Sequence, residues 1–123
     1  GNIDKFLQKI KNKNKKIIMI TNSSIKSINI FKEKYSIINY FDEIYTKENF
    51  TKKKPDPECY KIVAEKYKNY KMIGFEDSYP GFHALSLVKE IKPFHIKSLN
   101  YYYNDKIEKD YNVNIIENYD CFD

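Results

Sequence analysis

The sequence has no arginine and no tryptophan, and it contains only three glycines, four prolines and two cysteines. Cys59 and Cys121 lie far apart without partners at metal-ligand spacing, which argues against a disulfide framework or zinc site and favours a reducing compartment. No apolar run approaches the roughly 20 residues that a membrane-spanning helix needs. The lysine-rich start of the chain lacks the apolar segment of a signal peptide. These absences predict a cytoplasmic protein that does not enter a membrane.

All of the positive charge comes from lysine: the 22 basic residues outnumber 17 acidic ones and give a formal net charge of +5. This surplus is compatible with an anionic small substrate, and equally with an ordinary soluble surface. Nucleic-acid binding rests only on the lysine excess and the tyrosine content. We rank this function last, because arginine binds phosphates and base edges through two hydrogen bonds at once better than lysine does, and the sequence has no arginine.

The chain is long enough for one domain with a buried core and too short for two large domains. Its 123 residues are 41% hydrophobic and 16% aromatic, which argues against a disordered tail. We therefore expect a single domain over residues 1–123. Residues 1–100 carry its regular pattern, and residues 101–123 form a polar C-terminal extension with a short apolar pair, Ile115–Ile116.

Helical and strand patterns alternate along the chain, which predicts an α/β fold with a mostly parallel sheet flanked by helices. Such sheets bind ligands beyond the carboxyl ends of their strands. The loops that follow the strands therefore hold the candidate site residues. We expect helices over residues 4–13, 25–35 and 56–68 and one opening at Pro80, and strands over residues 16–21, 41–46, 71–75 and 94–96.

A run of hydroxyl and amide side chains, Thr21-Asn22-Ser23-Ser24, follows the first strand and opens a helix. Backbone N–H groups at a helix N-terminus bind anions such as phosphate. The same residue types are also common helix caps, and an ordinary cap is the simpler interpretation. Both interpretations stay open on the sequence alone.

Lys54 precedes a proline-stiffened turn, Lys54-Pro55-Asp56-Pro57. A lysine held at one place serves as a point charge for phosphate. However, Lys52, Lys53 and Lys54 form a charge run, and charge runs are usually solvated.

Two adjacent carboxylates, Glu76 and Asp77, follow the apolar strand 71–75. Such a pair can hold Mg²⁺, which keeps waters and shares phosphate oxygens. The alternative is a pair of acids favoured by the dipole of the next helix. We expect structural roles for His83, His95 and Cys59, because none has a ligand or an activating partner nearby in sequence.

The order of these motifs resembles the haloacid dehalogenase-like hydrolase superfamily, and within it the phosphatase and β-phosphoglucomutase-like branch. The segment Ile-Thr-Asn-Ser-Ser, the turn Lys-Pro-Asp-Pro and the run Phe-Glu-Asp-Ser-x-x-Gly are similar to its second, third and fourth motifs. The resemblance covers residues 4–96 and implies a Rossmann-like core. It implies that Thr21, Asn22, Ser23 and Lys54 bind the transferring phosphate, with Thr21 and Lys54 catalytic, and that Glu76 and Asp77 hold Mg²⁺.

The first motif of that superfamily, Asp-x-Asp on the central strand, has no counterpart in this sequence, and neither does the cap domain. The resemblance implies that the first aspartate is the nucleophile and that its strand lies between the strands ending at Thr21 and Glu76. Removing that strand would leave unpaired edges inside a sheet, which is unfavourable. We therefore expect upstream sequence, another chain, self-association or a rearranged sheet to fill the place.

Two functional hypotheses follow. In the first, the chain is part of a Mg²⁺-dependent phosphatase or phosphomutase that acts on a small organic phosphate through an aspartyl-phosphate intermediate. In the second, it is a catalytically inactive remnant that serves as a binding or interaction module. The chain alone is expected to be inactive under either hypothesis, because covalent catalysis needs its nucleophile.

Overall fold

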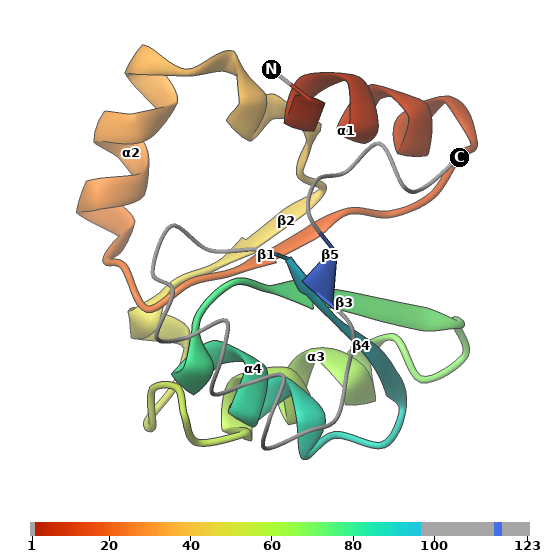
Figure 1. The fold of residues 1–123 in the computed structure, drawn as a ribbon. Helices are drawn as coiled ribbons and strands as arrows, with labels where there is room; N and C mark the ends of the chain where they lie inside the picture. The colour runs from red at the N-terminus through yellow and green to blue at the C-terminus, as the bar shows by residue number, and fades with distance from the viewer. Residues whose placement is uncertain (1, 97–114, 117–123) are drawn as a thin grey trace. The chain divides into compact units, whose positions relative to one another are not determined.

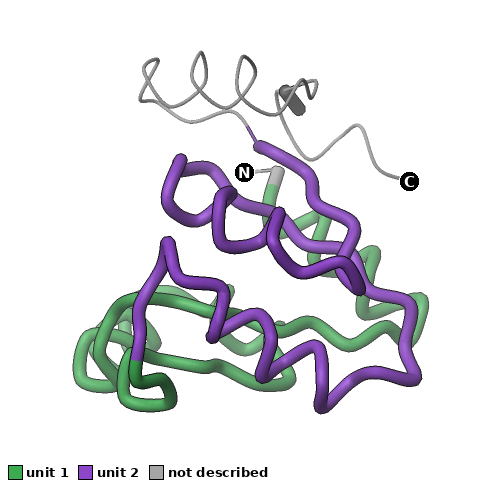
Figure 2. Tube along the Cα trace, turned by 90° about the horizontal axis from the view of Figure 1, so that it is seen from below, with its two compact units in different colours: residues 1–51, 119–123 green, residues 52–118 purple. Residues whose placement is uncertain are grey.

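Helices alternate with strands along the chain, and every strand pair is parallel (Figure 1). The computed structural model describes residues 2–96 and 115–116. These residues confirm the predicted α/β class. The chain divides into two compact units, residues 1–51 with 119–123 and residues 52–118, each of which is described by itself (Figure 2). Within the described ranges, no helix is both long and apolar enough to cross a bilayer.

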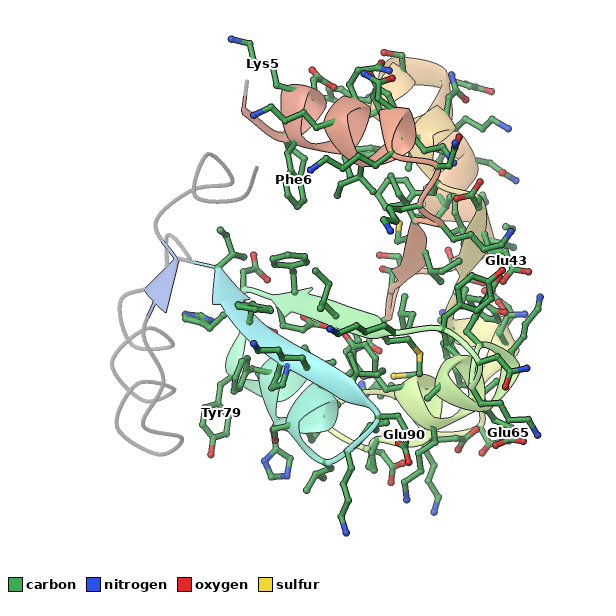
Figure 3. The ribbon with its side chains drawn as sticks, turned by 90° about the vertical axis from the view of Figure 1, so that its right-hand side faces the viewer. Lys5, Phe6, Glu43, Glu65, Tyr79 and Glu90 are labelled. Atoms are coloured by element: carbon green, nitrogen blue, oxygen red, sulfur yellow. The ribbon has the colours of Figure 1, made fainter. Side chains whose placement is uncertain are left out.

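The first unit contains a two-stranded parallel sheet. Strand β1 pairs with β2, with Met19 opposite Ile44. Helix α1 is amphipathic: Phe6 and Leu7 are buried, and Figure 3 shows Lys5 and Phe6 leaving opposite sides of the helix. The elements of this unit are α1 (Asn2–Asn12), β1 (Ile18–Ile20), α2 (Ile25–Lys34), η1 (Ser36–Tyr40), β2 (Glu43–Tyr45) and η2 (Lys47–Asn49).

Asp42 joins the end of α1 to the start of β1. Its carboxylate accepts a hydrogen bond from the Lys11 ammonium at 2.6 Å and another from the Ile17 backbone N–H at 2.7 Å. The bond from Lys11 is the largest of the effects that lower the pKa of Asp42 below its usual value. Helix α2, in contrast, has no buried residue, and Ile30 and Phe31 on it are exposed.

The second unit is a three-stranded parallel sheet in the order β3-β4-β5, and α3 and α4 cover one face of it (Figure 1). Phe82, Ala84 and Leu85 of α4 are almost fully buried, and Val63 and Ala64 of α3 are buried as well. The elements are α3 (Glu58–Lys66), β3 (Met72–Glu76), α4 (Tyr79–Ser86), β4 (Ile91–Ile96) and β5 (Ile115–Ile116). Val88, which follows α4, is buried as well.

Side chains alternate across the sheet as the strand geometry requires. Gly74 faces α4, because a Cβ built there would lie 2.7 Å from Leu85 Cδ1. Phe75 is the next residue, and its ring stacks on Phe94 with centroids 5.6 Å apart. Glu76, two residues after Gly74, therefore lies on the helix-covered face.

Several predicted boundaries shift by up to three residues, and two of the shifts matter for the second sheet. Glu76, expected in a loop, is the last residue of β3, and β4 begins at Ile91 instead of Phe94. The start of β4 was not predicted because Pro93 has no backbone N–H to donate to a neighbouring strand, and proline is therefore rare inside strands. Among the described residues β5 pairs only with His95 and Ile96, so Pro93 has a neighbour strand on one side alone, where proline is tolerated. Most of the predicted extension 101–123 lies outside the described residues; Ile115–Ile116 adds a strand to the sheet.

Candidate functional site

Thr21 follows β1 directly and shapes the turn into α2. Its backbone N–H donates to the Tyr45 carbonyl at 2.9 Å, and its Oγ1 accepts from the Ser23 N–H at 3.0 Å. Ser24 is the N-cap of α2, since its side chain accepts from the Ser27 N–H at 3.1 Å. The cap interpretation is therefore confirmed at Ser24, while Asn22 and Ser23 are exposed. The anion-binding role of the turn stays a prediction.

The loop after β2 holds this turn in place, which the sequence analysis missed. The Glu48 carboxylate accepts from the Ile25 N–H at 3.0 Å and from the Thr46 hydroxyl at 2.8 Å, and Thr46 is only 2% exposed. The hydrogen bond from Thr46 is the main cause that lowers the pKa of Glu48. Lys47 N–H also donates to the Ser23 carbonyl at 3.0 Å. A carboxylate of the chain itself thus lies at the N-terminus of α2, where the dipole favours negative charge.

Lys54 and Glu76, 22 residues apart, are brought together in the second unit. Lys54 Nζ lies 2.6 Å from Glu76 Oε2, and each side chain is only 10% exposed. Lys52 and Lys53 are exposed, which confirms for them the interpretation that this run of lysines faces solvent. That interpretation is wrong for Lys54. The Lys54–Pro55 peptide bond is cis.

Tyr60 on α3, within the helix expected over residues 56–68 but not among the expected site residues, contacts both members of this pair. Its hydroxyl donates to Glu76 Oε2, and Lys54 Nζ lies 5.4 Å from the centre of its ring. Burial, followed by the nearby Glu76 charge, raises the pKa of Tyr60 far above its usual range. The hydroxyl therefore stays protonated and is always a donor to the carboxylate.

The backbone of Glu76 is fixed from the neighbouring strand. His95 Nδ1 lies 3.1 Å from the Glu76 carbonyl, and this nitrogen is the donor because a carbonyl only accepts. His95 is 1% exposed, so its predicted structural role is confirmed. On the other side, a Cβ at Gly81 would lie 2.0 Å from Glu76 Oε1. Only glycine leaves the Glu76 carboxylate its present position.

The two remaining candidates among the polar side chains of this unit are also in structural surroundings. The His83 ring stacks on Tyr79 with centroids 6.2 Å apart, and Figure 3 shows Tyr79 pointing outward from α4. Cys59 is 1% exposed, and burial raises the pKa of its thiol, which keeps it protonated and unreactive.

The donor set at the end of β3 fits Mg²⁺ in its chemistry. Magnesium is usually bound by one or two carboxylates together with waters and substrate phosphates, and Glu76 and the exposed Asp77 provide two. All hydrogen bonds to the Glu76 side chain from described residues fall on Oε2, which leaves Oε1 for another ligand. No cluster of three or more His, Cys, Asp or Glu that could hold a metal occurs within residues 2–96.

Comparisons with known proteins agree with the α/β fold. The sequence profile of haloacid dehalogenase-like hydrolases matches residues 1–86, and the chain belongs to this family. No curated protein matches the sequence.

Solved structures of the same family share the architecture. One is a Thermotoga maritima protein assigned provisionally as a β-phosphoglucomutase, with 25% identity and a TM-score of 0.68 over 80% of this chain and 47% of its own. Another is a family hydrolase from Entamoeba histolytica, with 22% identity and a TM-score of 0.80 over 99% of this chain and 56% of its own. A third is a β-phosphoglucomutase from Clostridium difficile, with 24% identity and a TM-score of 0.69 over 99% of this chain and 51% of its own. The chain thus spans about half the length of these relatives.

Proposed function

We propose that the polypeptide containing this chain is a Mg²⁺-dependent phosphatase or phosphomutase that acts on a small organic phosphate. The observation that carries the proposal is the Lys54–Glu76 ion pair at the carboxyl end of β3, where parallel sheets bind ligands. Membership of the hydrolase family supports it. The likeness to a protein assigned as a β-phosphoglucomutase supports the choice of a phosphorylated substrate.

Each candidate side chain has a role that its chemistry suits. The Lys54 ammonium offsets negative charge on the transferring phosphoryl group, and the Thr21 hydroxyl donates to one of its oxygens, assisted by Asn22 and Ser23. Glu76 and Asp77 hold Mg²⁺. The cation, when bound, acts as a Lewis acid toward a phosphate oxygen.

The phosphoryl transfer itself needs an aspartate that this sequence does not contain. One carboxylate oxygen of that aspartate attacks phosphorus in line while the bond from phosphorus to the leaving oxygen breaks. A second carboxyl group gives its proton to that oxygen. Water, whose proton passes to the second carboxylate, then attacks the phosphorus of the acyl phosphate, and the bond between phosphorus and the acyl oxygen breaks, which releases phosphate and restores both carboxyl groups.

In this proposal, the strand that carries the aspartate pairs with a strand of the described sheets. Among the described residues β1 pairs only with β2, and β3 pairs only with β4. Ile18, Met19 and Ile20 are only half-buried, and Ile73 of β3 is 52% exposed, unusual for apolar strands of a parallel sheet. Upstream sequence of the same polypeptide is the favoured source. A partner chain or a second copy is the alternative, and intact mass with N-terminal sequencing of the natural protein distinguishes them.

The test is turnover of p-nitrophenyl phosphate with Mg²⁺ by the complete natural polypeptide. Lys54→Ala should lower kcat by about 100-fold or more, as loss of one electrostatic contact to a transition state does. Lys52→Ala, in the same run of lysines but exposed, should leave the rate unchanged. Absence of turnover in the natural protein, or equal rates for the two variants, would contradict the proposal.

The inactive binding module remains a second candidate, since the sequence lacks an Asp-x-Asp motif. It predicts that phosphate or Mg²⁺ raises the Tm of the chain by binding the folded state, while no metal supports turnover. Turnover by the 123-residue chain alone would exclude it.

A further inference from the structure

Tyr60 contacts both members of the Lys54–Glu76 pair. Its hydroxyl donates to Glu76 Oε2, the oxygen that also accepts from Lys54, and its ring lies beneath the Lys54 ammonium. The side chain is buried, at 6% exposure. The buried ring therefore fixes the hydroxyl at one place relative to Glu76 at the end of β3.

The hydrogen bonds divide the two carboxylate oxygens of Glu76 into different roles. Oε2 accepts from both Lys54 and Tyr60, whereas Oε1 accepts from none of the described residues. Oε1 lies against Gly81 and occupies the space that a side chain there would need, because a Cβ would lie only 2.0 Å from that atom. A carboxylate held through one oxygen presents the other in a defined direction.

We propose that Tyr60 is a positioning residue: it holds Glu76 through Oε2 so that Oε1 faces the divalent cation. The inference rests on the proposed function, which places the cation at Glu76 and Asp77. A partner that orients a metal-binding side chain typically changes metal affinity by about 10–100-fold when it is removed. A buried tyrosine that merely satisfied its own hydroxyl would change stability and leave metal affinity as it was.

The first experiment measures the Mg²⁺ affinity of the complete natural polypeptide by following the backbone amide signals of residues 74–79 and 81 in NMR titrations, which detect weak binding. Tyr60→Phe keeps the ring and removes the donor, and it should bind Mg²⁺ about tenfold more weakly. Tyr70→Phe, whose side chain is 52% exposed, is the matched control and should bind as the wild type does. Equal affinities for the wild type and Tyr60→Phe would overturn the inference.

A second measurement needs neither metal nor the Tyr60 variant to fold well. In protein labelled with ¹³C at the tyrosine ζ-carbon, the Tyr60 signal should move in Glu76→Gln, and the Tyr70 signal should not. An unmoved Tyr60 signal would show that the hydroxyl does not bind Glu76 and would overturn the inference directly.

The two failures can be told apart. If wild-type protein shows no Mg²⁺ binding that depends on Glu76 and Asp77, the cation site of the proposed function fails, and Tyr60 has only a structural role. If wild-type protein binds Mg²⁺ through these residues and Tyr60→Phe binds equally well, the proposed function stands and the positioning role alone is wrong.

Discussion

The two compact units contain ion pairs of the same length in different surroundings. Lys11 and Asp42 in the first unit, and Lys54 and Glu76 in the second, both approach to 2.6 Å. The side chains of the first pair are 31% and 30% exposed, and those of the second are 10% each. If distance alone mattered, the two pairs would contribute equally to stability. Water screens the first pair and is largely excluded from the second, so the second is the one whose disruption leaves an uncompensated charge.

The same contrast extends to the candidate site residues. Lys54 and Glu76 lie against a tyrosine of α3, beside the buried residues of α4. The turn at Thr21 precedes a helix without buried residues and is held by Thr46 and Glu48. The candidate residues of the second unit are thus held by packing around a charge, and the turn of the first unit by hydrogen bonds from the loop after β2.

The largest expected effect tests the two ion pairs directly. Lys54→Met should lower the free energy of unfolding by about 3 kcal/mol, because it leaves the Glu76 charge buried without its cation. Lys11→Met should cost about 0.5 kcal/mol. Urea unfolding of both variants measures the difference. Equal losses would show that burial does not distinguish the pairs.

Gly81→Ala should cost about 2 kcal/mol, because its Cβ overlaps the Glu76 carboxylate. The loss should disappear in a Glu76→Ala background. There the overlap is gone, and alanine is favoured over glycine in a helix by about 1 kcal/mol. Urea unfolding of the four proteins gives the comparison. If Gly81→Ala lowered the free energy of unfolding equally in the wild type and in Glu76→Ala, the overlap with Glu76 would not be the cause.

Thr46→Val tests the hydrogen bonds that hold the turn of the first unit. The substitution preserves shape and removes the donor to Glu48, so the free energy of unfolding should fall by about 1 kcal/mol. In a Glu48→Ala background the same substitution should cost less. Thermal or urea unfolding checks this, and full additivity would mean that the two residues do not interact.

The smallest effect is a pH dependence at Asp42. The folded-state pKa is lowered below the usual 3.8, so the unfolded state binds its proton first as the pH falls. The contribution of Asp42 is therefore complete above the unfolded value and is lost as the pH drops through the folded one. Unfolding free energies from about pH 6 down to about pH 2 should converge for wild type and Asp42→Asn. Parallel curves would rule out this assignment.

Much of the fold could be predicted from local patterns. The strand expected over residues 16–21 became β1, the helix expected over residues 4–13 became α1, and Ser24 caps α2 as its residue type suggests. These features depend on residues close in sequence, whose periodicity and capping chemistry act within a few turns. The boundary errors at Glu76 and Pro93 arose where strand pairing outweighed local preference.

The candidate site was only partly predictable for the same reason. Order and spacing along the chain indicated Thr21, Lys54, Glu76 and Asp77, because their residue types match a known set of motifs. Tertiary structure decided that Lys54, and not Lys52 or Lys53, leaves solvent, that Tyr60 and Gly81 fix the Glu76 carboxylate, and that Glu48 reaches the start of α2. Those contacts join residues from 5 to 23 positions apart. Local sequence specifies which groups are present, whereas their desolvation and mutual distances depend on how helices and strands pack.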